Sequence, residues 1–212
     1  MPALEPSHDC PLCPRLKAFR DENRVLYPDF FNGPVPVWRG ERPLLAIVGL
    51  APGLKGANRT GRPFTGDYAG DLLYATLKKF GLATGEYEQR PDDSLRLTHA
   101  AIINSVRCVP PQNKPTPAEI NTCRQFLIAA LADEPYVRVF LTLGRIGHES
   151  LLRALGLRLK DYPFAHGAEH HLPDGRAIFA SYHCSRYNTN TGVLTTEMFE
   201  EVVGRAAARA LE

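Results

Sequence analysis

The sequence predicts an α/β fold in which helices cover both faces of a mostly parallel sheet. Three observations lead to this prediction. Four short apolar runs have the length of buried strands, helical patterns separate them, and each run ends in a loop rich in Gly, Pro, Asn or His. Strands that alternate with helices are typical of parallel sheets with both faces covered.

The predicted elements of the first half follow in a regular order. A helix is expected at residues 13–27 and a strand at 44–48. The next helix begins at Tyr68, carries apolar residues at helical spacing and ends at Gly81, a residue type that favours helix C-caps. A second strand at 100–103 then follows.

In the second half, a helix is expected to begin after Thr116, which is followed by Pro and, three residues on, by Glu119 in a capping-box pattern. A strand at 137–143 and a helix at 145–155 come next. The last strand is 177–182 and the last helix 195–211. No repeat or change of composition divides the chain, so we expect one domain over residues 1–212.

Composition limits the class of protein. The chain has 212 residues, 44% of them hydrophobic, with 25 basic and 23 acidic side chains and a net charge of +2. These values fit a globular protein and exclude a long disordered chain or a coiled coil. No run approaches the roughly 18 apolar residues of a membrane span, and the N-terminal residues lack the apolar segment of a secretory signal. We therefore expect a cytoplasmic monomer with no membrane partner.

The loops at the carboxyl ends of the strands are where a parallel sheet places its ligand site. After the first strand, Gly49, Gly53 and Gly56 recur without a P-loop or a dinucleotide-binding pattern, so a tight turn is the simplest interpretation. Phe64 is an aromatic residue within this polar loop. It serves either as a stacking surface for a base or as a plug against the sheet.

Two other predicted strands end in polar side chains. His183 directly follows the last strand, where an imidazole can stabilise a developing anion or act as a general acid or base. Asn104 has the matching position after the second strand. Its amide offers a donor and an acceptor, which suits the reading of a base edge, although Asn is also a common turn former.

The cysteines suggest a metal or cluster site. Cys10 and Cys13 form a CxxC pair, which is also compatible with a redox pair, and Cys108 and Cys123 lie far along the chain. Four thiolates hold either zinc or a [4Fe-4S] cluster, and their spacing does not choose between them. Cys184 is expected to be a small residue of its loop.

Together these motifs resemble the uracil-DNA glycosylase superfamily, and most closely its family 5 (type b). The matching stretches are GLAPG (49–53), GANRTGRPFTGD (56–67), NSVRCVPPQNKPTP (104–117), the LG turn (143–144) and HCSRYNTNTG (183–192). The resemblance implies a three-layer α/β/α fold with a central four-stranded parallel sheet. It also implies a structural [4Fe-4S] cluster held by Cys10, Cys13, Cys108 and Cys123.

The resemblance further implies a reaction. Similar enzymes flip uracil out of DNA and hydrolyse its N-glycosidic bond, the first step of base excision repair. Phe64 would stack on the base, Asn104 would read its edge, and His183 would bond uracil O2 and stabilise the departing anion. The implied substrate-binding set also includes Gly49, Leu50, Ala51, Gly53 and Arg186, the last beside the gap left by the flipped nucleotide. Hypoxanthine and other deaminated bases are further candidate substrates.

The GLAPG stretch departs from the GEAPG of family 4, because apolar Leu50 and Ala51 stand where a water-activating residue is usual. Asp67 is the best substitute, ahead of Asn113; otherwise the reaction would rely on leaving-group stabilisation, with water adding late to a sugar cation. Asp67 also suits an N-cap of the helix from Tyr68, and the two roles are compatible.

Two other functions stay open at this point. The missing water activator fits a non-catalytic iron-sulfur module that binds damaged DNA or exchanges electrons. A zinc-stabilised hydrolase of free nucleotides is the third hypothesis.

The small net charge conceals an uneven distribution. Loops 49–66, 104–118, 144–148 and 183–196 contain no acidic residue, and their basic residues are Lys55, Arg59, Arg62, Arg107, Lys114, Arg145 and Arg186. The remainder of the chain is therefore net acidic. This pattern predicts a basic face around the site, suited to the phosphate backbone of DNA.

Overall fold

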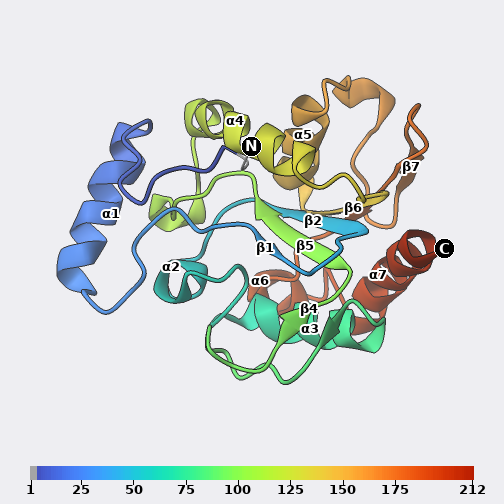
Figure 1. Ribbon diagram of the computed structural model, residues 1–212, viewed down its shortest axis with the longest axis horizontal. Helices are drawn as coiled ribbons and strands as arrows, with labels where there is room; N and C mark the ends of the chain where they lie inside the picture. Colours follow the sequence, from blue (N-terminus) through green and yellow to red (C-terminus); the bar gives the residue numbers. More distant parts are fainter. Residues whose placement is uncertain (1–3) are drawn as a thin grey trace.

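A six-stranded sheet forms the centre of the molecule (Figure 1), in a computed structural model that describes residues 4–212. The first three residues of the expected domain lie outside the described residues. The strand order is β1-β5-β2-β6-β8-β7. The middle four strands are parallel, as predicted, and a short antiparallel strand extends the sheet at each edge.

The four predicted strands, now β2, β5, β6 and β8, lie close to their predicted positions, and four short strands are added. The strands of the main sheet are β1 (Trp38–Arg39), β2 (Leu45–Gly49), β5 (Ala100–Asn104), β6 (Val139–Leu143), β7 (Glu169–His171) and β8 (Ala177–Ser181). A separate ribbon pairs β3 (Ala83–Thr84) with β4 (Arg96–Leu97). All residues of β2, β5, β6 and β8 are buried, as expected of a parallel sheet covered on both faces.

The five predicted helices are confirmed, and two short ones are added. The helices are α1 (Pro14–Leu26), α2 (Ala57–Thr60), α3 (Tyr68–Lys79), α4 (Pro117–Ala132), α5 (Arg145–Ala154), α6 (Arg186–Asn190) and α7 (Thr196–Leu211), with 3-10 turns at Pro111–Asn113 and Leu159–Asp161. The apolar positions of α3 and α7 pack on one face of the sheet, and those of α4 and α5 on the other. Helix α1 lies to one side of these layers (Figure 1).

Helix starts follow the predicted capping chemistry. Thr116 Oγ1 accepts from the Glu119 N–H at 3.3 Å, and the Glu119 carboxylate accepts from the Thr116 N–H at 2.7 Å, which completes a capping box on α4. Arg15 of α1 donates to the same Glu119 carboxylate at 2.7 Å. This ion pair ties α1 to the start of α4.

The order of the strands determines where a ligand can bind. The chain passes from β2 to β5 on one side, then crosses to β6 on the other side of β2. The switch point therefore lies beside β2, and a crevice is expected at the carboxyl ends of these strands. No helix within residues 4–212 is long and apolar enough to cross a membrane.

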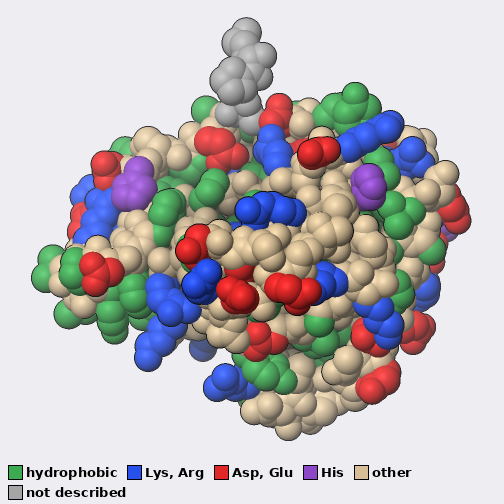
Figure 2. Space-filling view, turned by 60° about the horizontal axis from the view of Figure 1, so that its bottom comes forward, with side chains coloured by type: hydrophobic (Ala, Val, Ile, Leu, Met, Phe, Trp, Pro, Cys, Tyr) green, Lys and Arg blue, Asp and Glu red, His purple; other side chains and the backbone are tan. Residues whose placement is uncertain are grey.

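Charged side chains of both signs lie side by side on the face of the molecule presented in Figure 2. Surface ion pairs of the protein include Lys79 with Glu200 at 2.6 Å and Lys78 with Glu86 at 2.8 Å. Exposed pairs of this kind contribute little to stability. On the face in Figure 2, positive and negative side chains are interspersed, without an extended area of a single sign.

Candidate functional site

A cleft of about 820 Å³ opens at the carboxyl ends of β2, β5 and β8. Its lining includes almost all the residues predicted for the site: Leu50, Ala51, Gly53, Phe64, Asp67, Asn104, His183 and Arg186. Gly49 lies beneath them: a Cβ there would be 2.9 Å from Asn104 Oδ1 and 3.2 Å from Phe64 Cζ. The absence of a side chain at Gly49 thus allows Asn104 and Phe64 to meet.

The loop after β6 does not line this cleft, so its expected share in the site is corrected. It serves packing instead. A Cβ at Gly147 would be 3.0 Å from the Val48 carbonyl oxygen, so glycine allows α5 to approach β2 closely. His148 is buried and bonded to Thr142 and to the Tyr162 carbonyl oxygen.

Phe64 has an unusual backbone conformation and a ring that faces the site. Its φ is +51°, a left-handed value that is uncommon for a non-glycine residue. The ring is only 7% exposed and stacks on the His183 ring, with centroids 5.7 Å apart and planes inclined by 26°. Phe64 is therefore neither a free surface aromatic nor a simple core plug, because it belongs to the cleft wall.

Buried polar contacts hold the Phe64 backbone in place. The Tyr87 hydroxyl donates to the Phe64 carbonyl oxygen at 3.2 Å and accepts from the Gly66 N–H at 3.0 Å. The Tyr74 hydroxyl donates to the Pro63 carbonyl oxygen. Burial raises the pKa of Tyr87 to about 12, so this hydroxyl stays protonated and able to donate near neutrality.

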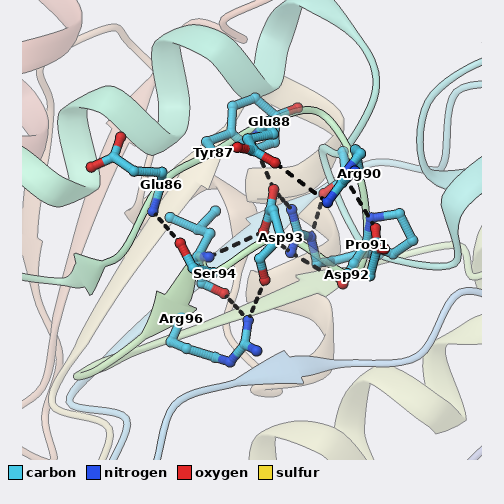
Figure 3. A network of polar contacts seen from close by, with 12 residues as sticks. Glu86, Tyr87, Glu88, Arg90, Pro91, Asp92, Asp93, Ser94 and Arg96 are labelled. Carbon is cyan, nitrogen blue, oxygen red and sulfur yellow. Dashed lines mark hydrogen bonds and ion pairs between the residues drawn. The ribbon is translucent and has the colours of Figure 1, made fainter.

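Asp93 lies within a network of polar contacts (Figure 3), and it forms a buried ion pair with Arg62 under the same loop. The two guanidinium nitrogens of Arg62 donate to the two carboxylate oxygens at 2.7 and 2.8 Å, and its Nε donates to Thr65 Oγ1 at 2.7 Å. Asp93 also accepts from the N–H groups of Glu88 and Leu95. The prediction that Arg62 belongs to a basic face was wrong, because its charge is internal and compensated.

His183 is the leading candidate for catalysis. The His183 ring stacks on the Phe64 ring. At the turn into α6, the His183 backbone carbonyl oxygen accepts a hydrogen bond from the Asn188 side chain at 2.8 Å. The ring Nδ1 is buried and has no hydrogen-bond partner in the described part of the chain. Burial lowers the pKa of His183 to about 4, so the imidazole is neutral at physiological pH.

Asn104 ends β5 with a side chain that points to the cleft. The residue is 4% exposed, and its amide has no hydrogen-bond partner among residues 4–212. The amide faces the cleft, so a ligand there finds a hydrogen-bond donor and an acceptor that none of the described residues occupies.

Asp67 lies at the start of α3, and its two carboxylate oxygens face different groups. Oδ1 accepts from the Gly70 N–H at 3.3 Å, which confirms the predicted N-cap. Oδ2 faces the glycine loop: a Cβ at Gly56 would lie 2.3 Å from it, and one at Gly53 would lie 3.4 Å away. Burial raises the pKa of Asp67 above its usual value.

The rim of the cleft carries basic and polar groups. Lys55 and Asn113 both line it. The guanidinium of Arg186 stacks over the Tyr68 ring, 5.2 Å from its centroid, and Arg186 is exposed in the first turn of α6. This position is open to a large ligand that approaches from outside.

The four predicted metal ligands lie in a second, smaller pocket. Cys10, Cys13, Cys108 and Cys123 all line it, and Leu16, Val106 and Phe126 supply its apolar wall. Within residues 4–212, no three His, Cys, Asp or Glu side chains converge closely enough to hold a single metal ion. Cys184, expected to be a small residue of its loop, is not among the residues that line this pocket. Its side chain is buried in the core against α3.

Two buried arginines contact this cysteine pocket. Arg20 donates to Cys108 Sγ at 3.6 Å, and the Arg107 N–H donates to Cys123 Sγ at 3.4 Å. The Arg107 side chain is 1% exposed and pairs with Glu5 at 2.9 Å. Arg107, like Arg62, was wrongly predicted to belong to a basic surface.

Sequence reasoning missed the residues that support the loops. Tyr74, Tyr87 and Asp93 follow Phe64 in the chain, in segments without a recognisable motif. Asp93 had no usable signal, because the ribbon that positions it was not predicted and its partner Arg62 lies 31 residues away. Arg20 had none, because its place in α1 looked like a solvated helix position.

Comparison with known proteins gives a consistent result. A family model described as the uracil DNA glycosylase superfamily matches residues 39–207. A type-5 uracil-DNA glycosylase of Thermus thermophilus is 47% identical over 202 residues, which cover 93% of this chain and 92% of that protein. Type-5 uracil-DNA glycosylases of Mycobacterium tuberculosis and Pyrobaculum aerophilum are 40% and 37% identical, over 93% and 95% of this chain and 76% and 89% of their own lengths.

Proposed function

This chain belongs to the uracil-DNA glycosylase superfamily, and from that membership we propose that it removes uracil from DNA by hydrolysis, as the first step of base excision repair. The bond between C1′ of the deoxyribose and N1 of uracil breaks, and its electron pair leaves with the base. Water adds to C1′ and loses a proton, which leaves an abasic site. The observation that carries this proposal is the convergence of Phe64, Asn104 and His183 in one cleft.

The geometry of the two rings constrains how a base would bind. A base between them would need about 3.5 Å on each side, and the Phe64 and His183 centroids are only 5.7 Å apart. The base would therefore stack on Phe64 and meet His183 at its edge. The free amide of Asn104 would then pair with polar atoms on the base edge, as in other flipped-base pockets.

His183 would act as a neutral hydrogen-bond donor to uracil O2. A donor placed where negative charge develops is among the largest contributions an enzyme makes to a rate. Because burial lowers the pKa of His183 to about 4, the ring would stabilise the leaving anion without transferring a proton to it. Stabilisation of the anion by a neutral donor does not require His183 to be protonated.

Asp67 would position the attacking water. Its Oδ2 faces the glycine loop while Oδ1 caps α3, so both roles are available to one carboxylate. Leu50 and Ala51 line the cleft but offer no side-chain group for this purpose. Arg186, in α6 at the rim, would lie beside the gap in the DNA, and the cleft volume of about 820 Å³ leaves room for hypoxanthine as well as uracil.

The cysteine pocket would hold a [4Fe-4S] cluster through Cys10, Cys13, Cys108 and Cys123. Such a cluster takes one thiolate at each iron, so its ligands need not converge on a single ion. The donor set fits, since four thiols surround one pocket and N–H groups bond two of the sulfurs. When bound, the cluster would cross-link the segment before α1, the loop after β5 and α4, away from the bond that breaks.

Release of free base from a uracil-containing oligonucleotide tests the proposal directly. We expect His183→Ala to slow single-turnover release by about 10²–10³-fold, the usual cost of losing such a donor. His171→Ala, on an exposed edge strand, is the matched control and should leave the rate unchanged. A wild-type protein inactive on both single and double strands would favour a non-catalytic DNA-binding module instead.

A further inference from the structure

Arg20 places a buried guanidinium in the wall of the cysteine pocket. The residue belongs to α1 and is only 1% exposed. Its Nη1 donates to Cys108 Sγ at 3.6 Å, and its Nη2 donates to the Cys10 carbonyl oxygen at 3.0 Å. One side chain thus contacts two of the segments that carry predicted cluster ligands.

The charge of Arg20 has no carboxylate partner among residues 4–212. The acidic groups Asp9 and Asp21 lie within range of its charge, but they bond to Arg24 and Lys17 at 2.7 and 2.6 Å and are themselves well exposed. Among residues 4–212, the Nε atoms of Arg20 and Arg107 are both buried without a hydrogen-bond partner, so the two arginines differ in their carboxylate contacts and not at this atom. A guanidinium stays protonated in proteins, and an unpaired buried charge is strongly unfavourable.

Arg107 shows what a compensated arginine looks like at the same pocket. It is equally buried, yet its side chain donates to the Glu5 carboxylate and to the Val35 carbonyl oxygen, both at 2.9 Å. Its backbone N–H, and not its guanidinium, bonds Cys123 Sγ. The contrast indicates that Arg20 is matched to an anion that belongs in the pocket itself.

We propose that Arg20 is the counter-ion of the iron-sulfur cluster, an inference that rests on the cluster proposed above. Four thiolates make the loaded centre net negative, so a cation in direct contact offsets its charge and stabilises the bound state. Positive charge and N–H bonds to a ligand sulfur also favour an added electron, and so raise the reduction potential. Arg20 is therefore a positioning and tuning residue and not a ligand.

Two substitutions separate the charge of Arg20 from its hydrogen bonds. Arg20→Gln keeps N–H donors and removes the charge, whereas Arg20→Lys keeps the charge and loses the planar fork. Lys17→Gln is the matched control, because Lys17 of the same helix also borders the pocket, but its charge is exposed and pairs with Asp21. Purified holoproteins are compared by iron and sulfide content, by midpoint potential in a dithionite titration, and by the rate at which a chelator bleaches the visible absorbance.

We expect Arg20→Gln to have a midpoint potential below wild type and to bleach about 10-fold faster or more. Arg20→Lys should stay near the wild-type potential but bleach faster, and Lys17→Gln should match wild type in both. Wild-type values for Arg20→Gln, or an equal shift in Lys17→Gln, would overturn the inference while leaving the cluster in place.

The remaining outcomes are also decisive. If Arg20→Gln does not accumulate as folded protein, Arg20→Lys decides: faster bleaching at an unchanged midpoint potential supports the counter-ion role, and either wild-type bleaching or a lowered potential overturns it. A wild-type protein without iron and sulfide would overturn the cluster and this inference together. Base-release activity is not a readout in any of these comparisons.

Discussion

His183 and Asp67 show how burial sets the ionisation of single residues in the cleft. Desolvation lowers the pKa of the imidazole to about 4 and raises that of the carboxyl. Both shifts favour the neutral form, because a low-dielectric site penalises charge of either sign. Pairs of titratable groups moved from their usual values are typical of catalytic sites.

The lowered pKa of His183 makes stability depend on pH. The unfolded histidine takes up a proton near pH 6.5, whereas the folded one does so only near pH 4. Between these values the unfolded chain binds more protons, so the contribution of His183 is present above pH 6.5 and is lost as pH falls to 4. We expect the thermal midpoint of wild type to drop more over this range than that of His183→Gln, measured by circular dichroism. Parallel curves would contradict the shift.

Asp67→Asn separates the two roles of that side chain. Asn caps helices as well as Asp does, and the substitution removes a charge whose burial is unfavourable. We therefore expect an unchanged or higher thermal midpoint together with markedly slower single-turnover base release. An unchanged rate would leave Asp67 with only its capping role, and water would then add late to a sugar cation.

At the scale of elements, the Arg62–Asp93 pair connects the Phe64 loop to the segment between β3 and β4. Removal of one partner leaves the other charge buried. We expect Asp93→Ala to lower the free energy of unfolding by about 3–5 kcal/mol. Urea denaturation measures this loss, and KM for the oligonucleotide should rise because the loop that holds Phe64 is released.

A paired replacement is the control for this prediction. Arg62→Met with Asp93→Leu removes both charges and should cost less than Asp93→Ala alone, as for other buried pairs. The exposed pair Lys17–Asp21 gives a second comparison, since Asp21→Asn should change stability little. A loss for Asp93→Ala as small as that of Asp21→Asn would show that the pair does not hold the loop.

The elements that the sequence predicts are those with long, local signals. Helices α3 and α4 have helical apolar spacing and caps such as Thr116, and β2 is a continuous apolar run. Strands β1 and β7 and helices α2 and α6 contain two to five residues, too few for a period to emerge. Their places depend on pairing with an existing sheet edge or on a loop that is fixed elsewhere.

The same distinction holds within the site. Phe64, Asn104 and His183 were predictable because each follows a strand or belongs to a motif, and strand ends meet at one edge of a parallel sheet. The burial of Arg62 could not be predicted, because its partner Asp93 lies 31 residues along the chain. The loop after β6 also follows a strand of the parallel sheet, so it was expected to line the cleft. Its residues pack elsewhere, because Gly147 allows α5 to approach β2 closely.

For the whole molecule, the internal positions of Arg62 and Arg107 reduce the charge available to DNA. Five of the seven loop cations are exposed: Lys55, Arg59, Lys114, Arg145 and Arg186. Each phosphate contact contributes about −0.9 to the slope of log K against log salt for duplex DNA. We expect a slope no steeper than about −4.5, measured by fluorescence anisotropy between low and physiological salt. A steeper slope would require cations outside these loops.

The strand order has a consequence for synthesis on the ribosome. Strand β2 lies at the centre of the sheet, but both of its neighbours, β5 and β6, come later in the chain. At roughly 5–20 residues per second, several seconds pass before β5 emerges to pair with β2. A fully apolar strand therefore waits unpaired in the nascent chain, a natural target for holding chaperones. Of the predicted site residues that line the cleft, His183 and Arg186 emerge last, so the enzyme becomes active only when nearly all of its chain has been made.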